Sequence, residues 1–190
     1  IAGRLLDRPK PIGFDMVQML SAMRHRGYDS TGFSLYGPPR QSGYVVRAHL
    51  DHARVIDKTV EAMALRLREA GTELVGEPSH VVTPSVGDAH LRFEIDDPAQ
   101  GIATMLRSVE SIKGLEVQSV GRSLEIVKDV GDANEVAGRH DLYDFVGSHG
   151  LGHDRMATES EVKAAFGHPF WARPFPDVSI VHNGQLTNYF

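Results

Sequence analysis

The chain has 190 residues, of which 41% are hydrophobic and 24% are charged, as is ordinary for a soluble globular protein. This length fits one domain, or one domain that carries a substantial insert. The formal net charge of −5 gives no electrostatic reason to bind nucleic acid or an anionic membrane. No apolar run approaches the ~18 residues of a membrane span, and without cysteine the chain has no disulfide or cysteine metal site. We therefore expect a cytoplasmic protein.

The first part of the chain predicts a strand, a helix and two more strands. Residues 1–6 are short and apolar, as in a strand. The apolar spacing over residues 14–23 predicts a helix with one buried face. Residues 30–36 and 43–49 predict strands, and the intervening Gly37-Pro38-Pro39 predicts a hairpin-like connection between them.

The character of the sequence changes over residues 53–120. An amphipathic helix is predicted over residues 53–70, closed by a glycine, and a second helix over residues 98–112 has proline in its first turn. Strand-like runs lie at 80–83, 89–95, 115–120 and 123–127. We therefore predict an inserted α/β subdomain over residues 53–120, within a domain formed by residues 1–52 and 121–190.

Beyond this stretch, residues 132–140 predict a short helix, residues 147–157 a strand, and residues 178–181 a buried strand. This last run ends at Asn183-Gly184, a pair that on local grounds forms a tight turn. The same turn would bring an Asn amide and the next backbone N–H together as two hydrogen-bond donors. Such a pocket can hold the oxyanion of a tetrahedral acyl intermediate.

Three other segments carry residues with chemical potential. Residues 152–158 read Gly-His-Asp-Arg-Met-Ala-Thr, in which the Arg155 guanidinium and the Thr158 hydroxyl can hold a carboxylate. The alternative is an arginine solvated at a strand end. Residues 26–32 read Arg-Gly-Tyr-Asp-Ser-Thr-Gly and follow the first helix, where the glycine can serve as a cap. His168 precedes a proline and can be structural.

Taken together, the identity and order of these four segments resemble the class-II glutamine amidotransferases, which are N-terminal-nucleophile hydrolases. The opening Ile1-Ala2-Gly3 fits as well, because a Cys-Gly pair directly precedes such an Ile in that family. The resemblance covers residues 1–49 and 121–190. It implies an α+β fold, a four-layer α-β-β-α sandwich, and hydrolysis of glutamine to glutamate and ammonia.

The resemblance also implies a role for each motif. The resemblance implies that Asn183 and Gly184 form an oxyanion hole. It also implies that Arg155, with Thr158 beside it, binds the substrate α-carboxylate. The implied walls of the glutamine pocket are Arg26, His168 and His182. The implied nucleophile is a cysteine two positions before Ile1, which uses its own α-amino group as the base. We therefore expect the chain to be cut at both ends, with an acidic residue for the substrate amino group beyond Phe190.

Residues 150–160 and the long insert are most similar to stand-alone amidotransferase subunits of the glutamate synthase type, including the small subunit of N-methylglutamate synthase. This implies a hetero-oligomer that passes ammonia to a partner synthase subunit, and Met156, where relatives often have an aromatic residue, bears on that transfer. The chain lacks a phosphate loop, GxGxxG and cluster cysteines. We therefore expect no cofactor and no metal on this chain; flavin and iron–sulfur clusters would belong to partner subunits. The insert is a hypothetical docking surface.

Two other interpretations stay open. A non-catalytic glutamine-binding or regulatory subunit would retain Arg155 and the pocket but lack the nucleophile. A metal hydrolase would use His149 and His153, which on one strand would share a face about 13 Å apart. Their spacing suits a helix, but the glycines around them disfavour one.

Overall fold

The computed structural model describes residues 1–23, 29–155 and 167–183. Within these ranges the chain forms two four-stranded sheets, with strand orders β1-β8-β2-β7 and β4-β5-β3-β6, and a two-stranded ribbon of β9 and β10. Every recorded strand pair is antiparallel. The first sheet contains β1 (Ala2–Pro11), β2 (Ser30–Tyr36), β7 (Leu124–Val130) and β8 (Val146–Arg155). The second contains β3 (Tyr44–Leu50), β4 (Leu74–Thr83), β5 (Asp88–Ile95) and β6 (Leu115–Gly121).

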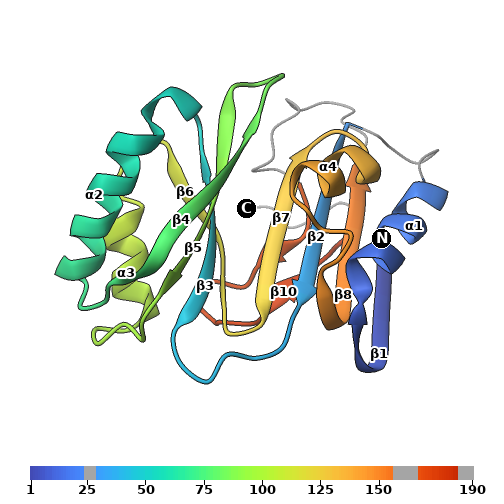
Figure 1. Cartoon of the computed structure of the whole chain (residues 1–190), viewed down its shortest axis with the longest axis horizontal. Coiled ribbons are helices and arrows are strands. Elements are labelled where there is room, and N and C mark those ends of the chain that lie inside the picture. Colours follow the sequence, from blue (N-terminus) through green and yellow to red (C-terminus); the bar gives the residue numbers. More distant parts are fainter. Residues whose placement is uncertain (24–28, 156–166, 184–190) are drawn as a thin grey trace, which may run out of the picture.

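Helices lie along the outer sides of the two sheets, so the predicted α+β class is confirmed (Figure 1). The short helix η2 (Ala53–Val55) leads into α2 (Ile56–Glu69), which lies with α3 (Ile102–Val109) beside the second sheet. The first sheet is flanked by α1 (Ile12–Ala22) and α4 (Ala133–Arg139). Among the helices of the described ranges, none combines the length and apolarity that a membrane span requires.

The helix α1 packs on the first sheet because its apolar residues recur at helical spacing. Met16, Val17 and Leu20 are fully buried, which confirms one buried face, whereas Phe14 is 52% exposed and lies outside it. The sheet meets this helix through glycines of β8. A Cβ atom on Gly152 would lie 2.7 Å from Leu20 Cδ1, so a larger residue there would force the buried Leu20 side chain to shift.

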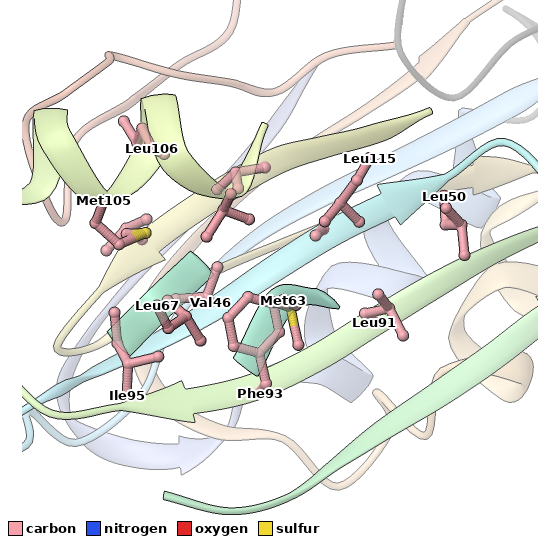
Figure 2. Packing of buried hydrophobic residues seen from close by; sticks show 14 of the residues in the cluster. Val46, Leu50, Met63, Leu67, Leu91, Phe93, Ile95, Met105, Leu106 and Leu115 are labelled. Carbon is pink, nitrogen blue, oxygen red and sulfur yellow. The ribbon is translucent and has the colours of Figure 1, made fainter. Parts of the chain in front are cut away.

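The second sheet shares one hydrophobic core with α2 and α3. Figure 2 shows Met63 and Leu67 of α2 and Met105 of α3 against apolar side chains of β3 and β5. Phe93 and Ile95 are each about 1% exposed, as expected for alternate residues facing the core along β5. Burial of this kind stabilises a fold by about 25 cal/mol per Å² of apolar surface.

Local signals set the ends of α2 and α4 close to the predicted positions, whereas α3 begins only at Ile102, so the prediction that Pro98 lies in its first turn was wrong. Asp132 caps α4 by accepting from the backbone N–H groups of Asn134 and Glu135, and the Glu135 side chain accepts in return from the Asp132 N–H. This reciprocal pair is a capping box. At the end of α2, Gly71 has a φ of +74°, a backbone conformation that glycine adopts without strain.

Two local predictions were wrong. The strands over residues 30–36 and 43–50 do not form a hairpin, because β2 pairs with β7 and β8 while β3 pairs with β5 and β6. The predicted buried strand over residues 178–181 is the short β10 (Ser179–Ile180), paired with β9 (Phe170–Trp171). Val178 is 46% exposed and Ile180 is 57% exposed, so this ribbon is not buried.

Residues 53–120 supply three strands of the second sheet, and all three join it through β3 or its neighbour. The hydrogen-bonded sheet therefore runs continuously from residues 44–50 into the stretch predicted as an insert. The division of the chain into two domains stays a prediction.

Candidate active site

In chain order the four motifs are residues 26–32, residues 152–158, His168 and the segment that ends at Asn183-Gly184. Adjacent strands bring the described parts of the first two together. Ser30 of β2 lies opposite Arg155 of β8, and Gly32 lies opposite His153. The Asp29 N–H donates to the Arg155 carbonyl oxygen at 3.2 Å, which extends the pairing by one residue beyond β2. The ends of these two strands therefore place residues 29–32 beside residues 153–155, although more than a hundred positions separate them in sequence.

His168 joins the same place because Gly32 has no side chain. A Cβ atom at Gly32 would lie 2.0 Å from the carbonyl oxygen of His168, a distance that no real contact allows. The absence of that atom lets the backbone at His168 lie directly on β2. The ring of His168 then stands edge-on to that of His153, with centroids 5.4 Å apart.

The strand β10 carries the fourth motif to β2. The Ser179 hydroxyl hydrogen-bonds the hydroxyls of Ser34 and Tyr36, at 2.7 and 2.9 Å. The chain continues from β10 to His182 and Asn183, whose side chains are exposed. The last described residues of the fourth motif therefore follow a segment fixed on β2.

Burial and neighbouring positive charge keep these histidines neutral. Burial is the main cause that lowers the pKa of His153 to about 4, and the positive charges of the chain start, His168 and Arg155 contribute to the same shift. Burial also lowers the pKa of His168, and His182, Lys128 and Arg155 each add to the effect. The pKa of His168 thus responds to residues from the second and fourth motifs, as expected of groups that share one site.

Lys128 is a member of this region that sequence reasoning missed. It lies opposite Gly32 on β7, is 4% exposed, and has its ammonium 5.1 Å from the centre of the Phe170 ring. Burial lowers its pKa to about 8. The sequence offered no signal for it, because a lysine in an alternating strand is ordinarily solvated.

The start of the chain lies beside the same strand. β1 pairs with β8 so that Ala2 is opposite Gly152 and Gly3 is opposite Leu151. This register brings Ile1 level with His153. The first residues of the chain therefore approach the end of β8 that carries Arg155.

Of the predicted site residues, Arg155, His168, His182 and Asn183 lie within the described ranges. Arg26, Thr158 and Gly184 lie outside the described residues, as does Met156. The roles of all seven site residues stay predictions. His149, from the metal alternative, stacks on Tyr36 with ring centroids 4.0 Å apart, at the other end of β8 from Arg155.

We expect Gly32→Ala to destabilise the fold and to displace His168. The added methyl group would meet backbone atoms, which cannot swing aside as a flexible side chain can. A loss of more than about 2 kcal/mol in the free energy of unfolding is expected from such overpacking. Urea denaturation measures it. Gly138→Ala is the matched control, because a Cβ there meets nothing within 4 Å; in α4 it should stabilise by about 0.5–1 kcal/mol. Equal effects of the two changes would contradict the close approach.

The carboxyl group of Asp154 makes the stability of the fold depend on pH. Burial raises the pKa of Asp154 to about 6. The Thr31 hydroxyl lies 3.0 Å from the Asp154 carboxyl and 2.8 Å from the Gly131 carbonyl oxygen. Its one hydrogen can serve one of these partners, so a protonated Asp154 that donates to Thr31 satisfies both contacts.

His153 and Asp154 therefore affect stability with opposite signs over nearly the same pH range. As pH falls from about 6.5 to about 4, His153 takes up its proton in the unfolded chain before it does so in the folded chain, which lowers the free energy of unfolding. As pH falls from about 6 to about 3.8, the folded chain protonates Asp154 first, which raises stability. Asp154→Asn should then lose stability more steeply than wild type between about pH 7 and about pH 4 in urea titrations, and His153→Gln less steeply. Parallel curves for the three proteins would refute the assignment.

A second polar cluster, also missed from the sequence, lies between the sheets. His90 of β5, Asp129 of β7 and His140 at the end of α4 are each at most 6% exposed. His140 Nε2 lies 3.0 Å from an Asp129 oxygen, and the Thr83 hydroxyl donates to the same carboxylate. Burial acts to raise the pKa of Asp129, but its hydrogen bonds and charged neighbours hold it far below its ordinary value. Burial lowers the pKa of His140.

Sequence comparison finds that this chain is similar to proteins whose names include glutamine amidotransferase. It is 34% identical over 186 residues to a protein of Methanothermobacter thermautotrophicus with the name "Putative glutamine amidotransferase", a match that covers 94% of this chain and 58% of that protein. It is 32% identical over 179 residues to "Glutamine amidotransferase-like protein GlxB" of Rhizobium meliloti, covering 94% of this chain and 54% of that protein. The chain thus spans a little over half the length of these relatives.

A more distant match covers part of the chain. A Saccharomyces cerevisiae protein with the name "Putative glutamine--fructose-6-phosphate aminotransferase [isomerizing]" is 28% identical over 102 residues, which cover 46% of this chain and 14% of that protein. No protein-family model matches the chain.

Proposed function

We propose that this chain is the glutamine-hydrolysing part of a class-II, N-terminal-nucleophile amidotransferase. The observation that supports the proposal is that strand pairing sets residues 29–32 beside residues 153–155, and that the bare Gly32 lets the backbone at His168 lie on β2. The segment that leads to His182 and Asn183 is held on β2 farther along, by hydrogen bonds of Ser179 with Ser34 and Tyr36. The names of the similar proteins support the same activity.

The order of layers supports the finer fold proposal. Helices α2 and α3, the second sheet, the first sheet, and then α1 and α4 follow one another across the molecule (Figure 1). This order is the one that a four-layer α-β-β-α sandwich requires. We propose that the fold is that of the N-terminal-nucleophile hydrolases.

The register of β1 offers a place for the proposed nucleophile. Over residues 2–5, the part of β1 nearest the start of the chain, partners have numbers that sum to 154, as in Ala2 with Gly152 and Arg4 with Gly150. Continued by two residues, the register would place the residue two before Ile1 opposite Arg155. Directly opposed residues in an antiparallel pair project to the same face of the sheet. A cysteine there would share a face with the proposed carboxylate grip.

The proposed reaction proceeds through a thioester. The α-amino group takes the proton of the cysteine thiol, and the resulting thiolate attacks the side-chain carbonyl carbon of glutamine, so that a C–S bond forms and the π electron pair of the carbonyl moves to its oxygen. The Asn183 amide and the Gly184 N–H donate to the carbonyl oxygen as it gains negative charge. The C–N bond then breaks, and ammonia leaves with the proton that the amine held. Water attacks the thioester, which releases glutamate and restores the thiol.

Substrate contacts and partners extend the proposal. Arg155 binds the α-carboxylate as a bidentate donor, with Thr158 beside it, and Arg26, His168 and His182 line the glutamine pocket. We propose that ammonia passes to a partner synthase subunit of the glutamate synthase or N-methylglutamate synthase type. Flavin or iron–sulfur groups, where used, sit on that partner.

The alternative is a glutamine-binding or regulatory subunit that lacks the nucleophile. A turnover assay separates the two. The intact protein, alone and with its partner subunits, is given glutamine, and glutamate and ammonia are measured together with binding by calorimetry. Equal amounts of glutamate and ammonia over many turnovers support the enzyme. Saturable glutamine binding without turnover, with the partners present, would leave the binding subunit.

A further inference from the structure

The His90–Asp129–His140 cluster has the composition of a metal site. One ring nitrogen of each histidine and one carboxylate oxygen of Asp129 lie within 4.8 Å of one another. Their exposed fractions are 5%, 1% and 6%, so the donors are shielded from solvent. They come from β5, β7 and the end of α4, and therefore from both sheets and a helix.

Unmet hydrogen-bonding atoms surround this cluster. Among the described residues, the buried atoms His90 Nε2, His140 Nδ1 and Gln118 Nε2 have no hydrogen-bond partner. The same three side chains line one cavity of about 10 Å³, which has room for a single water-sized ligand. A buried polar atom without a partner costs about 1–3 kcal/mol, so three around one cavity point to a bound group.

Two donor distances lie close to those of a tetrahedral ion. His90 Nε2 lies 3.4 Å from one Asp129 oxygen, and His140 Nε2 lies 3.0 Å from the other. Zinc–nitrogen and zinc–oxygen bonds of about 2.0–2.1 Å at tetrahedral angles place two ligand atoms about 3.3 Å apart. Two imidazoles and a carboxylate suit zinc or cobalt better than magnesium or calcium, which prefer oxygen.

We propose that His90, Asp129 and His140 bind one divalent ion of the zinc type, and that a water from the adjoining cavity supplies the fourth ligand. The site is independent of the proposed amidotransferase chemistry. Because its ligands link β5 to β7 and α4, the bound ion ties the two sheets together. Because the ion binds the folded chain and not the unfolded chain, it raises the free energy of unfolding by mass action.

Arg139 limits the affinity of this site. Its guanidinium donates to the Asp129 carboxylate, so the ion shares that carboxylate with a second positive charge. Arg47 also lines the cavity and pairs with Glu125, a carboxylate that it shares with Arg92, so its positive charge adds to that of Arg139 near the site. Replacement of Arg139 with an uncharged residue of similar length should therefore tighten metal binding, whereas loss of either histidine should weaken it strongly.

The test is metal binding to the intact protein after treatment with a chelator. Zinc is titrated against a chromophoric competitor, and cobalt is followed by its visible absorption, whose intensity reports tetrahedral coordination. We expect one ion per chain, an affinity lower by more than about 100-fold in His90→Asn and His140→Asn, and an affinity about tenfold higher in Arg139→Met. The exposed His52→Asn is the matched control and should bind as wild type does.

The outcomes separate clearly. No bound ion in either wild type or Arg139→Met, or binding that survives both histidine changes, would overturn the proposal and leave a hydrogen-bonded cluster only. Should the histidine variants fail to fold, the cobalt spectrum of wild type and the affinity of Arg139→Met decide. A six-coordinate spectrum, or weaker binding in Arg139→Met, counts against the site.

Discussion

Asn183→Ala is expected to lower kcat for glutamine hydrolysis by about 10²–10³-fold, with little change in the affinity for glutamine. The proposed role of the side-chain amide is to donate to an oxygen that carries full negative charge only in the transition state. Its loss therefore costs the reaction more than it costs binding. Initial rates over a range of glutamine concentrations, with the partner subunits present, measure both parameters.

Asn134→Ala is the matched control for this change. Asn134 is exposed on α4 and hydrogen-bonds Ser21 and Tyr143, remote from β10. It should leave kcat unchanged. An Asn183→Ala enzyme that keeps its kcat and loses only affinity would show that Asn183 binds substrate and does not stabilise the oxyanion.

Arg155→Met is the change with the second large effect, an expected fall of about 10²–10⁴-fold in kcat/KM. A bidentate pair between guanidinium and carboxylate contributes through two charge-assisted hydrogen bonds, each of about 1.5–3 kcal/mol. The loss should appear mainly as a higher KM, because the α-carboxylate does not change during the reaction. Arg155→Lys should recover part of the affinity, since lysine keeps the charge but not the planar pair of donors.

Arg68→Met, on the exposed face of α2, controls for the loss of a positive charge. Arg155 also takes part in strand pairing, because its carbonyl oxygen accepts a hydrogen bond from the Asp29 N–H, so the fold of the variant has to be checked. Circular dichroism and the urea midpoint of Arg155→Met establish that it folds. A folded Arg155→Met protein with wild-type KM would remove Arg155 from the substrate pocket.

The helices could be predicted because their signals are local. The spacing of Met16, Val17 and Leu20, the cap at Asp132 and the glycine at residue 71 each act within one or two turns. Strand positions also followed from alternation and bounding turns. Strand partners did not, because pairing depends on residues far apart: β2 found β7 and β8, not the strand that follows it in sequence.

The motifs of the candidate site were visible in the sequence, but their common location was not. It depends on β2 lying between β7 and β8 and on the bare backbone at Gly32. Lys128 and the His90–Asp129–His140 cluster escaped the sequence reasoning for the same reason. Each member sits alone in its own segment, and the two sheets must assemble before the donors meet.

The central claim is that a cysteine two positions before Ile1 performs the reaction at this site. The most direct measurement is the intact mass and N-terminal sequence of the native protein, before and after treatment with a glutamine-analogue electrophile, with partners present. We expect a free Cys-Gly-Ile start that takes up one label per chain and loses glutaminase activity in proportion. A start without cysteine, or a terminal cysteine that takes up no label, would contradict the account and leave a glutamine-binding subunit.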